Sequence, residues 1–122
     1  MAVNRMSVDR TWIFGELKRC LHALARDGDR ALASAPPGSC RADELALDYG
    51  NFISAAFGSF ERDFTSEQVV ALRRVDELLS AMSSEDQSDL WTDEAVRLHP
   101  RWQEVRSQAR AAVRVLGWEE PA

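Results

Sequence analysis

Histidine and cysteine are scarce in this chain of 122 residues, which contains two of each. No Cys-x-x-Cys, His-Glu-x-x-His or Glu-x-x-His motif is present, so the sequence predicts neither a zinc site nor a di-iron site. His22 and His99 stand in no spacing that defines a catalytic triad, and we expect an exposed side chain and a turn residue, respectively. The six glycines are scattered singly, which argues against a phosphate-cradling loop. We therefore expect no enzymatic activity, no metal and no cofactor.

Long apolar runs are also missing, although hydrophobic residues make up 45% of the chain and charged residues 29%. These proportions are typical of a globular protein, and no run is long enough to span a membrane. The first ten residues carry charge and lead into an amphipathic segment, so we expect no signal peptide and a cytoplasmic protein. Cys20 on a predicted buried helix face and Cys40 in a loop are expected to be reduced, with a disulfide between them as the alternative.

The pattern of apolar residues indicates helices throughout. No segment alternates apolar and polar residues as a half-buried strand does, and we find no internal repeat and no apolar seam that lasts three heptads. A chain of this length is the common size of one domain. The sequence therefore predicts an all-α fold, a single helical domain over residues 1–122, built as an antiparallel bundle of four to five helices.

Capping residues and breakers set the expected bounds of these helices. Ser7 can cap a first helix, and the sequence TSEQ at 65–68 fits a capping box. Thr92 can cap a short helix, while Gly117 is suited to end the last one. The expected helices are about 8–25, from 41 or 42 with an apolar face reaching 60, from 66 with a face reaching 82, 93–98 and 100–116. A short turn is added near 31–34.

Two glycines interrupt the helix expected to begin at 41 or 42. Gly50 and Gly58 each cost a helix up to ~1 kcal/mol relative to alanine. We interpret them as places where another backbone approaches closely, with a break in the helix as the weaker alternative.

Charge is distributed unevenly along the chain, whose net charge is −5. Residues 1–41 carry seven basic and four acidic side chains, residues 42–96 three basic and thirteen acidic, and residues 97–122 five basic and three acidic. The acidic middle segment repels phosphates, so direct nucleic-acid binding is not expected. Arg106, Arg110 and Arg114 form a basic stripe on the last helix, and we interpret it as a solvated flank that pairs with the acidic segment rather than as a phosphate site.

The stretch EDQSDLWTDE places an apolar pair, Leu90 and Trp91, among five acidic residues. One interpretation is structural: the pair folds back over the end of the bundle beside the Thr92 cap, while the acids solvate the connector. The other is functional, because an acidic platform with an aromatic anchor suits the capture of a basic partner. Both hold if Trp91 is half-buried. The candidate partner-binding residues are Glu85, Asp86, Asp89, Trp91, Asp93 and Glu94.

The run LWTDEAVRLHPRWQEVRSQARAAVRVLGW, residues 90–118, resembles the C-terminal part of small, all-helical bacterial immunity-type proteins. In these proteins a Leu-Trp-Thr acidic turn precedes a His-Pro-x-Trp helix start and an Arg-rich amphipathic helix. The resemblance implies a cytoplasmic protein that binds and neutralises a cognate toxin, often a basic nuclease. It identifies no residue as a proven contact. The matching positions are Trp91, Thr92, Asp93 and Glu94 in the turn, and Trp102 and Arg106 in the helix.

These observations lead us to expect a non-enzymatic protein-binding module, an immunity protein that inhibits a basic toxin through the acidic middle segment. Two alternatives stay open. A nucleic-acid-associated adaptor would use the stripe of three arginines. A small-molecule-binding bundle would surround a cavity with the aromatic residues Phe52, Phe57, Phe60 and Trp102. The sequence does not indicate an oligomeric state.

Overall fold

The computed structural model describes residues 2–33, 41–84 and 88–119, and within these ranges every regular element is a helix. The prediction of an all-α bundle is confirmed. Four long helices form it, joined by two helices of six residues and two short 3₁₀ turns. The elements in chain order are α1 (Ala2–Ala25), α2 (Gly28–Ala33), α3 (Arg41–Phe60), η1 (Glu61–Asp63), α4 (Ser66–Ser84), η2 (Ser88–Trp91), α5 (Asp93–Leu98) and α6 (Pro100–Leu116).

Most predicted caps are present in the structure. The capping box at α4 is reciprocal: the Thr65 N–H donates to Gln68 Oε1 at 3.0 Å, and the Gln68 N–H donates to Thr65 Oγ1 at 3.1 Å. Thr92 Oγ1 accepts from the Ala95 N–H at the start of α5. Gly117 ends α6 in the left-handed conformation, with φ of 69°, which a residue without Cβ adopts most easily.

Two expectations about helix bounds and glycines are wrong. Helix α1 begins at Ala2 and not after a cap at Ser7, because no proline or glycine interrupts the preceding residues. Helix α3 runs unbroken through Gly50 and Gly58, and a Cβ added at either would meet nothing within 4 Å. The close backbone approach lies instead at Gly28, where a Cβ would come within 2.5 Å of the Arg97 Cα.

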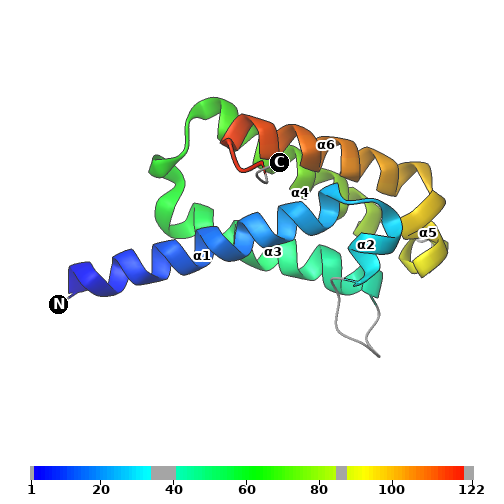
Figure 1. Ribbon diagram of the computed structural model, residues 1–122, viewed down its shortest axis with the longest axis horizontal. Helices are drawn as coiled ribbons and strands as arrows, with labels where there is room; N and C mark the ends of the chain where they lie inside the picture. The colour runs from blue at the N-terminus through cyan, green and yellow to red at the C-terminus, as the bar shows by residue number, and fades with distance from the viewer. Residues whose placement is uncertain (1, 34–40, 85–87, 120–122) are drawn as a thin grey trace.

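The long helices pack in a chain of contacts that leaves one side more open. Helix α1 packs along both α3 and α6, and α4 packs along α6, whereas α3 and α4 contact each other over a smaller part of their length (Figure 1). Helices α2 and α5 lie at the end of the bundle opposite the N-terminus. Each of the described α-helices contributes to the most deeply buried side chains. These include Leu17, Leu21, Leu32, Tyr49, Leu72, Val75, Met82, Val96 and Val105.

Helix α6 fastens the end of α1 with two arginines. Arg106 Nε donates to the Arg26 carbonyl at 2.7 Å, and its Nη2 donates to the Val96 carbonyl of α5 at 2.9 Å. Arg110 Nε donates to the Ala25 carbonyl at 2.7 Å. The Ala25 and Arg26 carbonyls lie at the C-terminal end of α1, where backbone acceptors lack partners within the helix and cations are favoured. Two of the three arginines in the basic stripe are therefore bound to backbone carbonyl groups, not to carboxylates of the acidic segment.

Substitutions at two glycines should change stability in opposite directions. We expect Gly58→Ala to raise the free energy of unfolding by up to ~1 kcal/mol, because alanine favours the helix and its methyl group meets open space. Gly28→Ala should lower it by about 1–3 kcal/mol, because the methyl group collides with the backbone of α5. Urea unfolding followed by circular dichroism measures both. Equal effects of the two substitutions would contradict the close approach at Gly28.

Candidate functional site

Leu90 and Trp91 have different surroundings although they are adjacent. Leu90 is fully buried in the core, whereas Trp91 is half-buried. The Trp91 ring meets the Trp102 ring edge to face, with centroids 5.8 Å apart. Leu90 thus closes the core, and part of the Trp91 ring reaches the surface, which is the condition under which the structural and the functional interpretations are compatible.

Trp102 holds this segment in place. Its indole Nε1 donates to the Leu90 carbonyl at 2.7 Å, inside the core. The bond satisfies a carbonyl group of η2 that would otherwise be buried without a partner. It also sets the direction in which the next residue, Trp91, leaves the core.

The four candidate residues that the structure describes have different surroundings. Glu85 and Asp86 lie outside the described residues. Trp91 faces a groove between α3 and α4. The Oδ2 atom of Asp93 lies 4.0 Å from the Nε atom of Arg41, at the start of α3. The remaining two, Asp89 and Glu94, line a separate hollow of about 420 Å³ beside the exposed Leu98.

The groove that Trp91 lines is larger than the hollow beside Leu98, and we call it the acidic groove. It occupies about 640 Å³ along the side of the bundle where α3 and α4 contact each other least. Its walls combine apolar side chains, three serines and two carboxylates. The lining residues are Asp43, Ala46, Leu47 and Gly50 of α3, Asp76, Leu79, Ser80, Ser83 and Ser84 of α4, and Trp91 of η2.

Two carboxylates of the acidic groove form no ion pair with a described residue. They are Asp43 and Asp76, and neither takes part in a described ion pair or side-chain hydrogen bond. Burial raises the pKa of Asp76, the neighbouring Glu77 raises it further, and Arg73 only partly opposes them. The fold thus holds a carboxylate where its ionised form is disfavoured, a pattern that is common at functional sites.

Apolar surface lies next to these carboxylates. Leu47 is 58% exposed, which is high for a large aliphatic residue. Together with Leu79 and the accessible part of Trp91 it gives the groove an apolar floor. A groove of this chemistry fits a side chain with an apolar stem and a cationic end, as arginine and lysine have.

Sequence reasoning missed Asp43, Leu47 and Asp76 as members of a site. A signal was present for Leu47, which stands off the apolar face of its helix, as a leucine with no place in the core. For the two aspartates the pattern gave no signal, because an acidic residue off the apolar face is ordinary in a surface helix. Their pairing across a groove depends on how α3 and α4 pack.

Both histidines form hydrogen bonds within the fold, and Cys20 is buried. His99 caps α6, its Nδ1 accepting from the Arg101 N–H at 3.1 Å. His22 is half-buried and not exposed as expected; its Nε2 lies 2.7 Å from the Trp118 carbonyl, to which it donates. Burial raises the pKa of the Cys20 thiol to about 11, which keeps it protonated and poorly nucleophilic at neutral pH. Cys40, its partner in the alternative of a disulfide, lies outside the described residues.

The aromatic residues proposed to surround a cavity pack in pairs instead. Phe52 meets Trp12 edge to face with centroids 5.4 Å apart, and Phe57 meets Phe64 at 5.8 Å. Phe60 packs on Phe14 at 5.9 Å. Trp102 is buried against Trp91, as described above. These contacts use the rings as packing surfaces, which weakens the hypothesis of an aromatic ligand cavity.

Within the part of the chain that the structure describes, no cluster of three or more histidine, cysteine or acidic side chains could hold a metal ion. None of the described helices is long and apolar enough to cross a membrane. Comparisons with protein families, with curated proteins and with solved structures find no match to this chain. The function is therefore argued from the geometry of the site.

The hydrogen bond from Trp102 can be tested by removing its donor. We expect Trp102→Phe to lower the free energy of unfolding by about 1–3 kcal/mol beyond the loss of ring area, because the buried Leu90 carbonyl loses its donor. Trp118→Phe is the control, since no hydrogen bond from its indole N–H is found among the described residues. Urea unfolding measures both. Equal losses would show that the Trp102–Leu90 bond contributes little.

Asp76→Asn should stabilise the fold at neutral pH. The folded protein holds the Asp76 proton more tightly than the unfolded chain does, because the pKa is raised in the folded state. Stability contributed at this position is therefore present at low pH and is lost as the pH rises through the raised pKa. The asparagine variant cannot ionise at this position and does not lose this stability. It should therefore be more stable than the wild type at pH 7, and the difference should vanish in acid.

The control for this prediction is Asp43→Asn. Asp43 lies in the first turn of α3, where a carboxylate is favoured by the helix dipole. Its replacement should make the fold slightly less stable at pH 7, opposite in sign to Asp76→Asn. Denaturant midpoints of the two variants and the wild type, measured across a pH series, show the sign of each stability change. A loss of stability for Asp76→Asn at pH 7 would contradict the assigned cost of ionisation.

Proposed function

We propose that this chain is a non-enzymatic protein-binding module that captures a basic protein in the acidic groove. The observation that carries the proposal is the juxtaposition of Asp43 and Asp76, which form no ion pair with a described residue, with the exposed Leu47 and the half-buried Trp91. A cationic side chain placed there would pair with the carboxylates while its stem covers the apolar floor.

Each part of the groove would serve a separate step of binding. The carboxylates of the acidic middle segment would attract a basic surface and speed the encounter. Trp91 and Leu47 would then lose their remaining contact with water. A tryptophan at the centre of an interface often contributes ~2 kcal/mol or more to affinity. Its position is fixed in advance by the bond from Trp102 to Leu90, so little ordering is required on binding.

The finer proposal is that the partner is a toxin which this chain neutralises in the cytoplasm. The resemblance of residues 90–118 to immunity-type proteins supports it, since that resemblance includes the turn that carries Trp91. The hollow lined by Asp89 and Glu94 lies near the same segment and would extend the contact with a basic surface.

The adaptor alternative has less support. Of the three arginines in its stripe, Arg106 and Arg110 donate to backbone carbonyls of α1 and α5. Their Nε groups are thus engaged, and Arg114 alone is without a described partner among the residues of the structure.

A photo-crosslinking experiment in the native host tests the proposed surface. We expect a photo-reactive benzoylphenylalanine at position 47 to form an adduct with one basic protein. The matched control is the same residue at position 70, because Val70 is 60% exposed, close to the 58% of Leu47, but does not line the groove. Mass spectrometry identifies the adducts. An acidic partner, or the same adduct from both positions, would contradict the proposal.

The purified partner then permits a test of the carboxylates. Asp43→Asn combined with Asp76→Asn should weaken binding at least about tenfold, with a reduced dependence on salt. Glu67→Gln combined with Glu104→Gln removes the same charge from exposed positions outside the groove and should have a smaller effect. Asp89→Asn with Glu94→Gln asks whether the neighbouring hollow contributes. Equal weakening by the groove and control pairs would assign the effect to net charge alone.

A further inference from the structure

Helix α4 carries a row of exposed residues on the side that faces away from the core. The residues that point into the bundle are Leu72, Val75, Leu79 and Met82. Four other residues recur at intervals of four, three and four, which places them in one line along the outer side of the helix. We call this line the outer stripe, and all its members are exposed: Val70, Arg74, Glu77 and Ala81.

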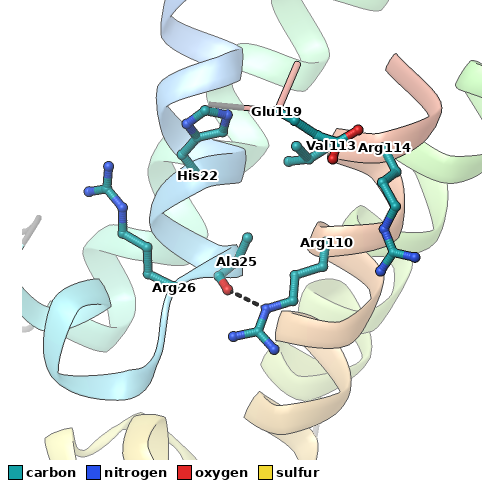
Figure 2. A pocket seen from close by; sticks show the side chains of 7 residues that line it. All are labelled: His22, Ala25, Arg26, Arg110, Val113, Arg114 and Glu119. Atoms are coloured by element: carbon teal, nitrogen blue, oxygen red, sulfur yellow. Dashed lines mark hydrogen bonds between the residues drawn. The ribbon is translucent and has the colours of Figure 1, made fainter. Parts of the chain in front are cut away.

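The neighbours of α4 pack on other sides of it. The residues of α4 that line the acidic groove face α3, among them Asp76 and Ser80. Helix α6 packs along α4 and fastens α1 with the flank that carries Arg110, which Figure 2 shows reaching to the Ala25 carbonyl. The outer stripe therefore remains in contact with water in the isolated chain, and Val70 is 60% exposed.

The two charged residues of the outer stripe, Arg74 and Glu77, form no ion pair with a described residue. The neighbouring Arg73 differs, because its Nη2 donates to Glu61 at 2.6 Å and its guanidinium lies 4.9 Å from the centre of the Phe57 ring. Arg73 thus contributes to the fold. The charges of Arg74 and Glu77 are left for a partner outside the chain.

The outer stripe is complementary to itself. Arg74 and Glu77 lie equally far on either side of the midpoint between residues 75 and 76, and so do Val70 and Ala81. When two copies of α4 lie antiparallel about a two-fold axis at that midpoint, Arg74 meets Glu77 of the second copy and Val70 meets Ala81 of the second copy. The spacing of four and three residues is the one at which paired helices meet. A parallel pair in register, or a shift that centres on Arg74 or on Glu77, opposes like charges.

We propose that the outer stripe binds a second copy of this chain, with the two α4 helices antiparallel and related by a two-fold axis. Each contact then occurs twice: an ion pair between Arg74 and Glu77, and an apolar contact between Val70 and Ala81. The stripe covers about three turns of helix, which is less than a standard interface requires. We therefore expect a reversible dimer that forms at high protein concentration. None of the stripe residues lines the acidic groove, so this proposal is independent of the proposed function.

Sedimentation velocity of the full chain in about 0.15 M salt tests the pairing, because this salt screens the repulsion between two chains of net charge −5 beyond about 8 Å. We expect a reversible monomer–dimer equilibrium as the concentration rises to about 1 mM. Arg74→Glu and Glu77→Arg should each weaken the dimer at least about tenfold, because each places like charges opposite one another. An equimolar mixture of the two variants should dimerise again, because their charges are complementary.

Arg114→Glu and Glu104→Arg are the matched controls, because they reverse the same charges at exposed positions of α6 outside the stripe. Each should change the dissociation constant less than about twofold. Circular dichroism checks that all variants are equally helical. The proposal is overturned if the wild type stays monomeric, if a control reversal weakens the dimer as much as Arg74→Glu, or if the mixed variants do not associate.

The register of the pair has a separate test. Photo-reactive benzoylphenylalanine at position 70 of the purified chain should form an adduct between two copies, joined near residue 81 of the second copy. The same residue at position 47, in the acidic groove, should not. Mass spectrometry of a mixture of ¹⁴N and ¹⁵N chains shows that the adduct joins two molecules. An adduct joined elsewhere, or one that forms in the host only with a different protein, would assign the stripe to another partner and overturn the proposal.

Discussion

The arrangement of this bundle depends on backbone carbonyl groups that end one segment and are satisfied by side chains of another. Helix α6 supplies the donors: Trp102 to η2, Arg106 to α1 and α5, and Arg110 to α1. A helix end or a tight turn that is buried without such donors loses stability, because water cannot replace the missing bonds. The same helix therefore fixes the end of α1, the position of α5 and the direction of Trp91.

This central role of α6 explains why the opposite side of the bundle is open. Helices α1 and α4 both pack on α6, and α3 packs on α1, so α3 and α4 contact each other less than they contact these neighbours. The acidic groove occupies the space that remains. The uneven charge of the sequence becomes a spatial division for the same reason, because α3, α4 and α5 belong to the acidic segment while α1 and α6 together carry more basic than acidic side chains.

The sequence predicts local structure here better than it predicts the site. Caps at Thr65, Thr92 and Gly117 act within one turn of their own helix, so their residue types are sufficient to place them. The partners of Arg106 lie 80 and 10 residues away, and no spacing in the sequence reveals them. The acidic groove is likewise assembled from three elements. Trp91 was identified because an aromatic residue among acids is unusual, whereas Asp43 and Asp76 look like any solvated acids until α3 and α4 are packed.

Asp76 shows why the groove is more than a gap left by packing. The helix caps and the hydrogen bonds to backbone carbonyl groups do not require this groove to be open or its walls to be charged. Instead a carboxylate is retained where burial and Glu77 disfavour its ionised form, and Arg73 compensates this only in part. Leu47 is likewise held in water beside it. Both features reduce stability in the isolated chain, and both would be relieved by the proposed event, the arrival of a cationic group on an apolar stem.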